Sequence, residues 1–552
     1  MATSMANDRG GLSSSHVRVI TASSIGTMFE WYDFYLYGSL AANIAAQFFT
    51  KLDATSGLIM ALLAFAAGFF VRPFGALLFG RLGDLIGRKY TFLITIMIMG
   101  SSTFLVGCIP SYETIGIAAP VILIILRLLQ GLALGGEYGG AATYVAEHAP
   151  PGKRGFYTSF IQITATFGLF LSLVVILLCK NLFGAEKFAD WGWRIPFLIS
   201  FFLLVISVYI RLQLQESPLF QQMKAEGRGS KAPLSESFMK WDNLKIVLLA
   251  LFGATAGEAV VWYGGQFYSL FFLGSVIKVD PTLVSYLIAG ALLIATPFFV
   301  VFGALSDKIG RKPIIMAGCL LAALTYFPIF KGLTHYGNPA LETASATNPV
   351  VVTADPATCA FQFDPVGKRQ YRDSCDIVKN YLSKAGVPYT NKEAPAGTLA
   401  TVQIGTTSLT SFEGGSLEPA VFKTQADAFN KQLGDSLKTA GYPAKADPAA
   451  VNWPMLLLLL TILVIYVTMV YGPIAAWLVE LFPTRIRYSS LSLPYHIGNG
   501  WFGGFLPSIS FALVALSGDI YFGLWYTVVI SVMTLIIGTL FLRETKDVDI
   551  TR

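Results

Sequence analysis

Apolar stretches of about 20 residues recur along the chain, and shorter polar stretches separate them. A helix needs about 20 consecutive apolar residues to cross the hydrocarbon core of a bilayer. The pattern therefore predicts twelve membrane-spanning helices. The first six are expected at 20–47, 57–80, 90–109, 117–145, 156–182 and 193–212. The second six are expected at 245–273, 283–305, 313–331, 453–473, 487–515 and 520–542.

Two long polar stretches interrupt this pattern and divide the chain into two six-helix halves. The first stretch is a linker between the halves, and the second is an insertion of 121 residues (452 − 332 + 1) after the ninth span. The insertion is rich in Ala, Thr, Gly and Pro, which fits a small folded cap as well as a largely disordered segment. The expected units are an N-terminal tail at 1–19, a first half at 20–212, the linker at 213–244, a second half at 245–331 and 453–542, the insertion at 332–452 and a C-terminal tail at 543–552.

Lysine and arginine gather in the short loops at one end of the expected spans. Short cytoplasmic loops of membrane proteins carry an excess of these residues. The basic loop residues are Arg81, Arg88, Lys89, Lys153, Arg154, Lys308, Arg311, Lys312, Arg485 and Arg487. All lie on one side if the spans alternate. We therefore expect this side to be cytoplasmic, both termini to share it, and the 332–452 segment to be periplasmic.

The composition supports a membrane protein and argues against several other classes. Hydrophobic residues make up 54% of the 552 residues and charged residues only 13%, and the mean hydropathy is +0.61. The net charge is only +6, and no basic stripe with interleaved aromatics suggests a nucleic-acid partner. The sequence has no P-loop, four histidines and no Cys-x-x-Cys pair, which argues against ATP-driven, metal and redox chemistry. We expect no cofactor and no enzymatic activity, and the polar N-terminus shows no cleavable signal peptide.

Two of the five cysteines lie close together in the polar insertion. Cys359 and Cys375 are expected to face an oxidising compartment, where a nearby pair can form a disulfide. Because the sequence does not place their Cα atoms, two free thiols remain the alternative.

An internal repeat organises the apolar part of the chain. Gly80-Arg-Leu-Gly-Asp84-Leu-Ile-Gly87-Arg88-Lys89 recurs as Gly303-Ala-Leu-Ser-Asp307-Lys308-Ile-Gly310-Arg311-Lys312, with an offset of 223 residues (303 − 80). A Trp-Tyr pair at 31–32 recurs at 262–263, with an offset of 231 residues (262 − 31). Two landmarks in the same order indicate two related halves. The glycines permit tight turns, and the aspartates can accept hydrogen bonds from a neighbouring helix end. We expect this motif to act as a cytoplasmic gate that breaks in one conformation.

The repeated motif resembles the signature of the major facilitator superfamily. A narrower likeness, to the metabolite:proton symporter family of bacterial permeases for shikimate, oxoglutarate, citrate and proline/betaine, lies in six segments. They are Glu30-Trp-Tyr-Asp33-Phe-Tyr35, Arg72-Pro73-Phe-Gly75, Arg127-Leu-Leu-Gln130-Gly131, Gly135-Gly136-Glu137, Glu216-Ser217-Pro218 and Phe482-Pro-Thr-Arg485-Ile-Arg487-Tyr488-Ser489. The resemblance implies an all-α fold of twelve transmembrane helices, proton coupling, and a coupling role for Arg127 with Gln130 beside it. Leu85 departs from the first motif, where a basic residue is usual, and the 332–452 insertion is not a general family feature.

Several ionisable side chains fall inside the expected spans, where they are costly unless they face a cavity or a partner. The acids are Glu30, Asp33, Glu137 and Glu258, and the bases are Arg72 and Arg127. A desolvated carboxyl group tends to take up a proton. An arginine can bind a carboxylate of the substrate or of the protein, so competition between the two links substrate binding to protonation.

These considerations give each polar side chain a hypothetical role. Proton coupling is assigned to Asp33 first and Glu30 second, with Arg127 and Glu137; an interhelical hydrogen bond is the alternative for Glu137. Substrate binding is assigned to Arg127, Gln130, Tyr37, Tyr138, Glu258, Trp262, Tyr263, Gln266, His496 and Asn499, although interfacial aromatics and a structural histidine are the plainer interpretation for some of them. The gate is assigned to Arg72, Gly80, Asp84, Gly87, Arg88, Gly303, Asp307, Gly310 and Arg311, with substrate contact as the alternative for Arg72.

The leading hypothesis is a proton-coupled symporter that takes up a small metabolite, an organic acid, across a bacterial inner membrane by alternating access. Two core arginines favour an anionic substrate. A zwitterionic osmolyte such as betaine or proline is the alternative, with aromatic side chains around its cationic end. A remoter alternative is a sensor or binding scaffold that uses the 332–452 segment. The expected partners are a small-molecule substrate and the lipid bilayer, without nucleic acid, and the protein is expected to work as a monomer.

Overall fold

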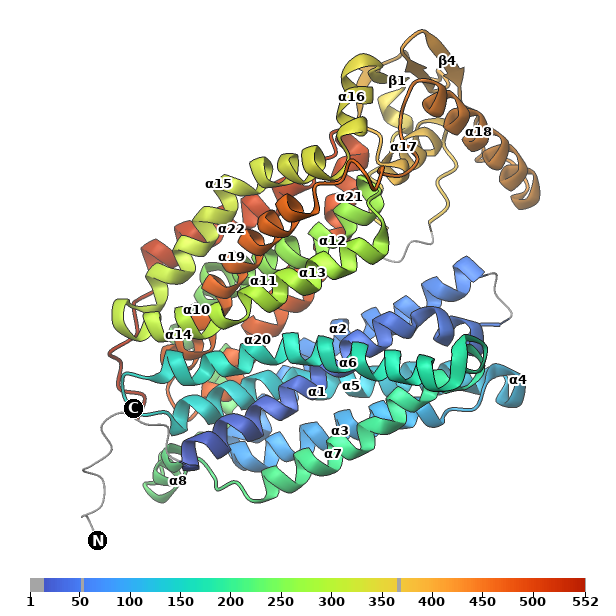
Figure 1. The fold of residues 1–552 in the computed structure, drawn as a ribbon. Coiled ribbons are helices and arrows are strands. Elements are labelled where there is room, and N and C mark those ends of the chain that lie inside the picture. The colour runs from blue at the N-terminus through green and yellow to red at the C-terminus, as the bar shows by residue number, and fades with distance from the viewer. Residues whose placement is uncertain (1–13, 51–53, 365–368, 552) are drawn as a thin grey trace.

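The computed structural model describes residues 14–50, 54–364 and 369–551, and Figure 1 shows their arrangement. Side chains at a few helical positions, Glu30 among them, lie outside the described part. The helices form two groups, one from each half of the chain, that lie side by side.

The first half is built from long apolar helices. They are α1 (Ser14–Phe48), α2 (Ala54–Leu85), α3 (Arg88–Cys108), the short α4 (Tyr112–Ile115), α5 (Ala118–His148), α6 (Arg154–Asp190) and α7 (Ile195–Leu212), with a 3-10 turn, η1 (Gly192–Arg194), before α7. Within this half α2 packs on α5, α1 on α6, and α3 on both α5 and α7. Two short helices, α8 (Pro218–Ala225) and α9 (Pro233–Phe238), occupy the expected linker.

The second half repeats this architecture with more irregular helices. It contains α10 (Trp241–Ala250), α11 (Ala256–Trp262), α12 (Ser269–Phe271), α13 (Pro281–Ala295), α14 (Pro297–Ile309), α15 (Arg311–Gly337), α19 (Trp453–Leu481), α20 (Arg487–Ile497), α21 (Leu506–Ser517) and α22 (Leu524–Phe541). π-Helical turns join some of these into longer rods: η2 (Leu251–Thr255), η3 (Tyr263–Tyr268), η4 (Phe272–Val276) and η6 (Gly498–Gly503). Such turns are common at functional sites.

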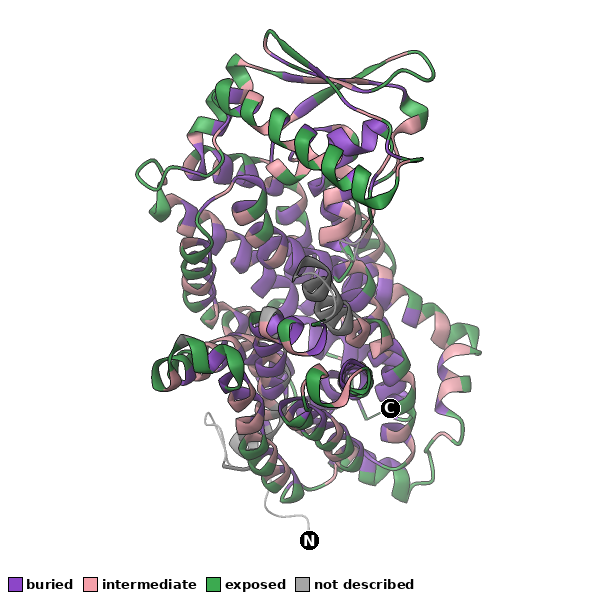
Figure 2. Cartoon of the chain, turned by 90° about the vertical axis from the view of Figure 1, so that its right-hand side faces the viewer, coloured by how far each residue is buried: buried purple, intermediate pink, exposed green. Residues whose placement is uncertain are grey.

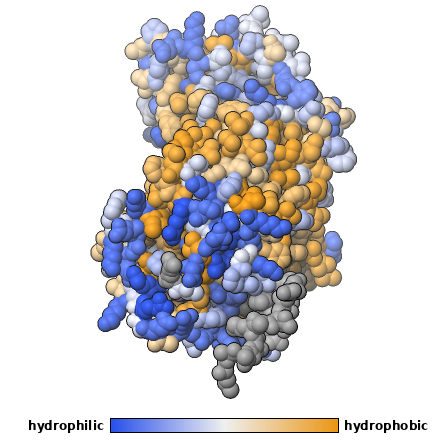
Figure 3. Space-filling model, turned by 90° about the vertical axis from the view of Figure 1, so that its left-hand side faces the viewer, coloured by the Kyte–Doolittle hydropathy of each residue, from blue (hydrophilic) through white to orange (hydrophobic). Residues whose placement is uncertain are grey.

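Ten helical segments of the described residues are long and apolar enough to cross a membrane. They cover ten of the expected spans, and the largest difference is at the span expected at 453–473, whose helix continues to Leu481. The remaining two expected spans coincide with α1 and α2, helices of 35 and 32 residues whose side chains are described in part. Figure 3 shows a broad hydrophobic flank between a hydrophilic top and a hydrophilic lower face, as a bilayer-embedded surface requires.

The 339–452 segment, which we call the cap, departs from the all-α expectation. It contains α16 (Pro339–Thr347), β1 (Val350–Ala354), the 3-10 turn η5 (Pro356–Thr358), α17 (Ser374–Ala385), β2 (Tyr389–Glu393), β3 (Thr401–Ile404), β4 (Thr407–Thr410) and α18 (Pro419–Thr439). The strands form one sheet in the order β2-β1-β3-β4, parallel between β1 and β2 and antiparallel elsewhere. The all-α prediction thus describes the two helical halves but not the cap. Of the two alternatives for this segment, the structure has the folded one, and α15 extends to Gly337, beyond the predicted end of its span.

The cap sits at one end of the second half, and the C-terminus lies at the other end (Figure 1). Buried side chains run up through the bundle into the cap, while the outer faces of the cap helices are exposed (Figure 2). Asn391 of β2 donates hydrogen bonds to the carbonyl oxygens of Leu516 and Ser517 at the end of α21, at 3.1 and 2.8 Å. Cys359 and Cys375 form a disulfide within the cap.

The two halves meet along two equivalent helix pairs. In one, α2 of the first half packs on α20 of the second; in the other, α6 of the first half packs on α14 of the second. A Cβ atom on Gly80 of α2 would lie 2.8 Å from Ser489 Cα, and one on Gly303 of α14 would lie 2.5 Å from Ser159 Cβ. Glycine at these two repeated positions therefore allows the halves to approach closely.

Candidate functional site

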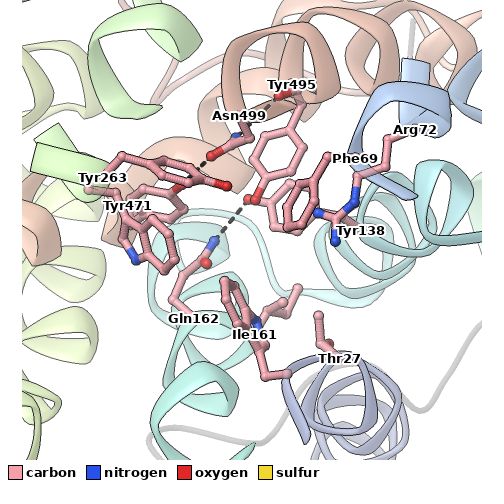
Figure 4. Close-up of a pocket in the computed structure, with 12 residues that line it drawn as sticks. Thr27, Phe69, Arg72, Tyr138, Ile161, Gln162, Tyr263, Tyr471, Tyr495 and Asn499 are labelled. Carbon is pink, nitrogen blue, oxygen red and sulfur yellow. Dashed lines mark hydrogen bonds between the residues drawn. The ribbon is translucent and has the colours of Figure 1, made fainter. Parts of the chain in front are cut away.

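A small pocket lies between the two halves, and both contribute its walls (Figure 4). Aromatic rings and amides dominate the lining. The first half supplies Thr27, Trp31, Phe69, Arg72, Tyr138, Ile161 and Gln162, and the second supplies Trp262, Tyr263, Tyr471, Tyr495 and Asn499. Arg72 is the only charged side chain among the described residues that line the pocket.

The pocket is closed around a volume of only about 30 Å³. A space of this size admits water but is far too small for a metabolite. A neighbouring space of about 10 Å³ shares Trp31, Gln162, Trp262 and Tyr471 and is also lined by Gln266. A solute can therefore occupy this region only when the two halves move apart.

Hydrogen bonds and ring stacking hold the polar side chains of the pocket in place. Gln162 Nε2 donates to the Tyr138 hydroxyl at 2.8 Å, and the Tyr471 hydroxyl donates to Asn499 Oδ1. The Tyr138 ring stacks on Tyr495 across the two halves, with centroids 3.6 Å apart and planes 3° apart. The two hydrogen bonds each lie within one half, whereas the stacked tyrosines join α5 of the first half to α20 of the second. They couple the shape of the pocket to the relative position of the halves.

Arg72 lines this pocket. It lies in α2, three turns before Asp84, and its guanidinium carbon is 4.2 Å from the centre of the Phe69 ring. This position matches the alternative of substrate contact, and the assignment of Arg72 to the gate stays a prediction. The sequence could not decide between them, because the face of α2 that Arg72 occupies is set by packing against α5 and α20.

Arg127 lies away from the pocket, in a buried ion pair with Asp33. Nη1 of Arg127 is 2.8 Å from Oδ2 of Asp33, and the guanidinium carbon is 3.7 Å from the centre of the Tyr37 ring. Oδ1 of Asp33 and Nε and Nη2 of Arg127 are buried without a hydrogen-bond partner. Gln130, one turn along α5, donates instead to Thr103 at 2.5 Å. In this conformation Arg127, Gln130 and Tyr37 therefore do not line the pocket.

Glu137 forms part of a separate interhelical clamp. It pairs with Arg211 of α7, a residue that the count of core charges omitted, and accepts a hydrogen bond from Thr95 of α3 at 2.8 Å. The three helices α3, α5 and α7 are thereby joined. Of the two alternatives for Glu137, its position matches the interhelical hydrogen bond.

Glu258 and His496 also lie behind the pocket wall. Glu258 in α11 is completely buried, and Asn499 Nδ2 donates to its Oε2 at 3.4 Å. His496 in α20 is buried as well and does not line the pocket. The side chain of Glu30 lies outside the described residues.

The repeated motif forms two equivalent charge clusters at the end of the bundle that carries the C-terminus. In the first, Asp84 accepts hydrogen bonds from the backbone N–H groups of Tyr488 and Ser489, at 3.2 and 2.9 Å, at the start of α20. Arg88 pairs with Asp84 at 3.0 Å and lies 3.6 Å from Glu147. The first half thereby binds the N-terminus of a helix from the second, where the helix dipole favours a negative charge.

The second cluster mirrors the first. Asp307 accepts from the backbone N–H groups of Gly155 and Phe156, both at 2.8 Å, at the start of α6. Arg311 pairs with Asp307 at 2.8 Å and with Glu480 at 3.0 Å. In each cluster the aspartate of one half binds the N-terminus of a helix from the other half.

Gly87 and Gly310 shape the turns of both clusters. Their φ angles are 130° and 112°, a backbone conformation that residues other than glycine rarely adopt. Glu216 accepts from the N–H groups of Arg88 and Lys89 after the first turn, at 3.1 and 3.2 Å. Glu544 does the same for Arg311 and Lys312 after the second, at 3.0 and 2.9 Å.

The C-terminal residues cross both clusters. Arg154 donates to the carbonyl oxygen of Val548 at 3.0 Å, and Arg487 donates to that of Ile550 at 2.8 Å. The C-terminal tail therefore accepts hydrogen bonds from an arginine of each half and so connects the two halves at the closed end.

Sequence reasoning missed four of the gate partners, although a signal for them was present. Glu147 and Arg154 recur as Glu480 and Arg487, both with an offset of 333 residues (480 − 147 and 487 − 154). From the sequence, Arg154 and Arg487 are placed among the basic loop residues, and Arg487 also in a segment that carries the family resemblance, without a partner for either. A search for repeated charge pairs, rather than for glycine motifs alone, would have found them.

Comparisons with known proteins agree with this architecture. The sugar (and other) transporter family matches residues 19–246. The chain is 35% identical to the alpha-ketoglutarate permease of Escherichia coli K12 over 343 residues, which cover 61% of this chain and 78% of that protein. It is 37% identical to the proline/betaine transporter of the same strain over 326 residues, 57% of this chain and 64% of that protein.

A solved structure shows the same fold. The major facilitator superfamily proton:xylose symporter XylE, bound to 6-bromo-6-deoxy-D-glucose, superimposes with a TM-score of 0.62 over 98% of each chain. The sequences are only 16% identical, so this likeness concerns the fold alone.

Proposed function

The chain belongs to the major facilitator superfamily, among its metabolite transporters, and we propose that it imports a small organic acid together with protons. Arg72 carries this proposal, as the only charged side chain among the described residues that line the pocket. A guanidinium offers two parallel N–H donors to a carboxylate. The amides of Gln162 and Asn499 add further polar groups around it. The alpha-ketoglutarate permease among the relatives is named for such a substrate.

Transport proceeds by alternating access between the two halves. In the structure the pocket is closed, and the gate clusters tie the halves together at the end that we assign to the cytoplasm. Opening that end breaks the hydrogen bonds of Asp84 and Asp307 to the opposite half together, because both lie on the same interface. Opening the other end leaves them intact. The two clusters therefore stabilise one of the two access states.

Proton coupling rests on the buried pair of Asp33 and Arg127. The pair is buried, and one oxygen of Asp33 has no hydrogen-bond partner. Movement of α1 relative to α5 separates the two groups and favours protonation of the carboxylate, since an isolated buried charge is costly. Protons are the proposed coupling ion, and no cofactor takes part.

The topology follows from the same proposal. Twelve spans place both termini in the cytoplasm of a bacterial cell and the cap in the periplasm, where its disulfide is stable. The protein acts as a monomer, because each half completes the pocket of the other. An enzymatic role has no place in this arrangement.

The aromatic side chains favour a second candidate, a zwitterionic osmolyte. Trp31 and Trp262 lie with ring centres 5.3 Å apart, and Tyr263 lies 4.7 Å from Trp262. Such rings can hold a quaternary ammonium group while Arg72 holds the carboxylate. The proline/betaine transporter among the relatives is named for substrates of this kind. Both candidates use the same arginine and differ in whether the rings contribute to binding.

Uptake into proteoliposomes with an inward acid step tests the proposal. Radiolabelled 2-oxoglutarate, glycine betaine and proline are compared in the wild type, in Asp33→Asn and in Asp242→Asn, whose acid is exposed on α10. We expect acid-driven uptake of 2-oxoglutarate that is lost only in Asp33→Asn. Uptake of betaine instead supports the second candidate. Uptake that neither depends on the pH step nor changes in Asp33→Asn contradicts the proposed proton coupling.

A further inference from the structure

Glu258 differs from the other buried carboxyl groups that the structure describes in the two helical halves. The others are Asp33, Asp84, Glu137, Glu147 and Glu480, and each has an arginine within ion-pair distance. No ion pair among the described residues includes Glu258, although its side chain is completely buried. A lone ionised carboxylate in such a place costs several kcal/mol. The closed structure therefore favours the neutral acid.

Among the described residues, the side chains that face Glu258 offer hydrogen bonds and no positive charge. The elements packed on α11 are α15, α19, α22, η2, η3 and η6. The titratable side chains that they bring to the carboxyl are Tyr471 of α19 and Cys319 of α15. Two other nearby hydroxyl groups point elsewhere, since Tyr326 donates to the carbonyl oxygen of Val261 and Tyr526 to that of Phe502.

Glu258 is connected to the pocket through the side chains that line it. Asn499 donates to Glu258 Oε2 at 3.4 Å and accepts from the Tyr471 hydroxyl, and both Asn499 and Tyr471 line the pocket. Oε1 of Glu258 has no hydrogen-bond partner. Close packing seals the other side, because a Cβ atom on Gly257 would lie 2.6 Å from Thr534. The side chains of Asn499 and Tyr471 therefore link Glu258 to the pocket.

We propose that Glu258 holds a proton in the closed state and releases it through Asn499 and Tyr471 when the pocket opens and fills with water. The inference rests on the proposed proton-coupled uptake and adds a proton site in the second half. In this conformation Asp33 is paired with Arg127, whereas Glu258 has no arginine or lysine partner among the described residues. Release converts the neutral acid into a carboxylate and a hydrated proton, and rebinding reverses the step.

Infrared spectroscopy of the purified protein tests the protonation state without any substrate. We expect the carbonyl stretch of a protonated, buried carboxylic acid at neutral pH in the wild type and in Cys319→Ser. The band should be absent from Glu258→Gln and retained at a shifted position in Glu258→Asp. A wild-type spectrum that does not change in Glu258→Gln overturns the proposal.

Transport measurements test the coupling separately. Glu258→Gln should retain counterflow of the substrate identified in the uptake screen, but should lose its accumulation driven by a pH gradient and move fewer protons per substrate. Glu258→Asp should restore the proton movement in part. If the wild type moves no protons, the proposed symport itself fails. If the wild type moves protons and Glu258→Gln moves as many, only the role of Glu258 is overturned. If counterflow is lost in both Glu258→Gln and Glu258→Asp, Glu258 acts in substrate binding or folding instead.

Discussion

Arg487 of the second half lies 2.7 Å from Glu147 of the first, and both side chains are buried. The equivalent pair, Arg154 and Glu480, is longer, at 3.5 Å. The two halves are therefore held by charge pairs that cross between them in both directions, with the tighter pair on the side of α20.

We predict that Arg487→Ala opens the gated end. Removing one partner of a buried ion pair costs about 3–5 kcal/mol, and only the state with this end closed makes the pair. A cysteine placed at Ser492, between the gate and the pocket, should then react faster with a polar thiol reagent in inside-out vesicles. Arg485→Ala is the control, because Arg485 is half exposed and binds only Glu236. Equal labelling of the two variants would argue against the gate.

Arg72→Lys should raise the KM for a carboxylate substrate and change the maximal rate less. Lysine keeps the charge but loses the planar pair of donors. Loss of hydrogen bonds to a charged group costs about 1.5–3 kcal/mol, which corresponds to roughly 10- to 150-fold in affinity. Uptake into proteoliposomes at a series of substrate concentrations measures the KM and the maximal rate. An unchanged KM would remove Arg72 from the binding site.

Glu216→Gln and Glu544→Gln should have similar effects, because the two residues occupy equivalent places in the two clusters. Each change weakens the charge-assisted hydrogen bonds to two backbone N–H groups, and we expect a loss of about 1–3 kcal/mol in thermal unfolding. The effects should add in the double variant, since the residues share no partner. A change in only one of the variants would contradict the equivalence.

Loss of the disulfide should loosen the cap without stopping transport. Cys359 and Cys375 are 16 residues apart, and closing a loop of that size contributes about 3 kcal/mol. The double change Cys359→Ser/Cys375→Ser should therefore speed proteolysis within 339–452, whereas Cys108→Ser should not. If uptake fails in the double variant, the cap contributes to transport directly.

The cap should also lose stability as the pH rises through mild acid. Burial of Asp376 in α17 raises the pKa of its carboxyl group above its usual value. The folded cap then binds more protons than the unfolded one between the two pKa values, so its stability falls as the pH rises through that window. Asp376→Asn keeps an oxygen for the hydrogen bond from Ala360 and should flatten this dependence. The rate of proteolysis of the cap at a series of pH values measures this pH dependence of its stability.

Much of the architecture follows from the sequence alone, because its cause is local. A run of about 20 apolar residues in a bilayer favours a helix, since a helix satisfies all its backbone hydrogen bonds within the segment. The repeated Gly80 and Gly303 mark equivalent helices for a local reason as well, because only glycine permits the close approach of the two halves at these positions. The pocket positions of Trp262, Tyr263 and Asn499 were also expected from their places on the spans.

The tertiary structure decided which charges meet. The sequence shows Arg72 and Arg127 as equivalent core arginines, but α2 turns one into the pocket while α5 turns the other onto Asp33. It shows Glu137 and Arg211 on separate helices without saying that these helices touch. Ion pairs form between residues far apart in the chain, and their partners depend on helix rotation and crossing. Glu258 illustrates the same limit, because only the packed helices around it reveal that no arginine of the described residues forms an ion pair with it.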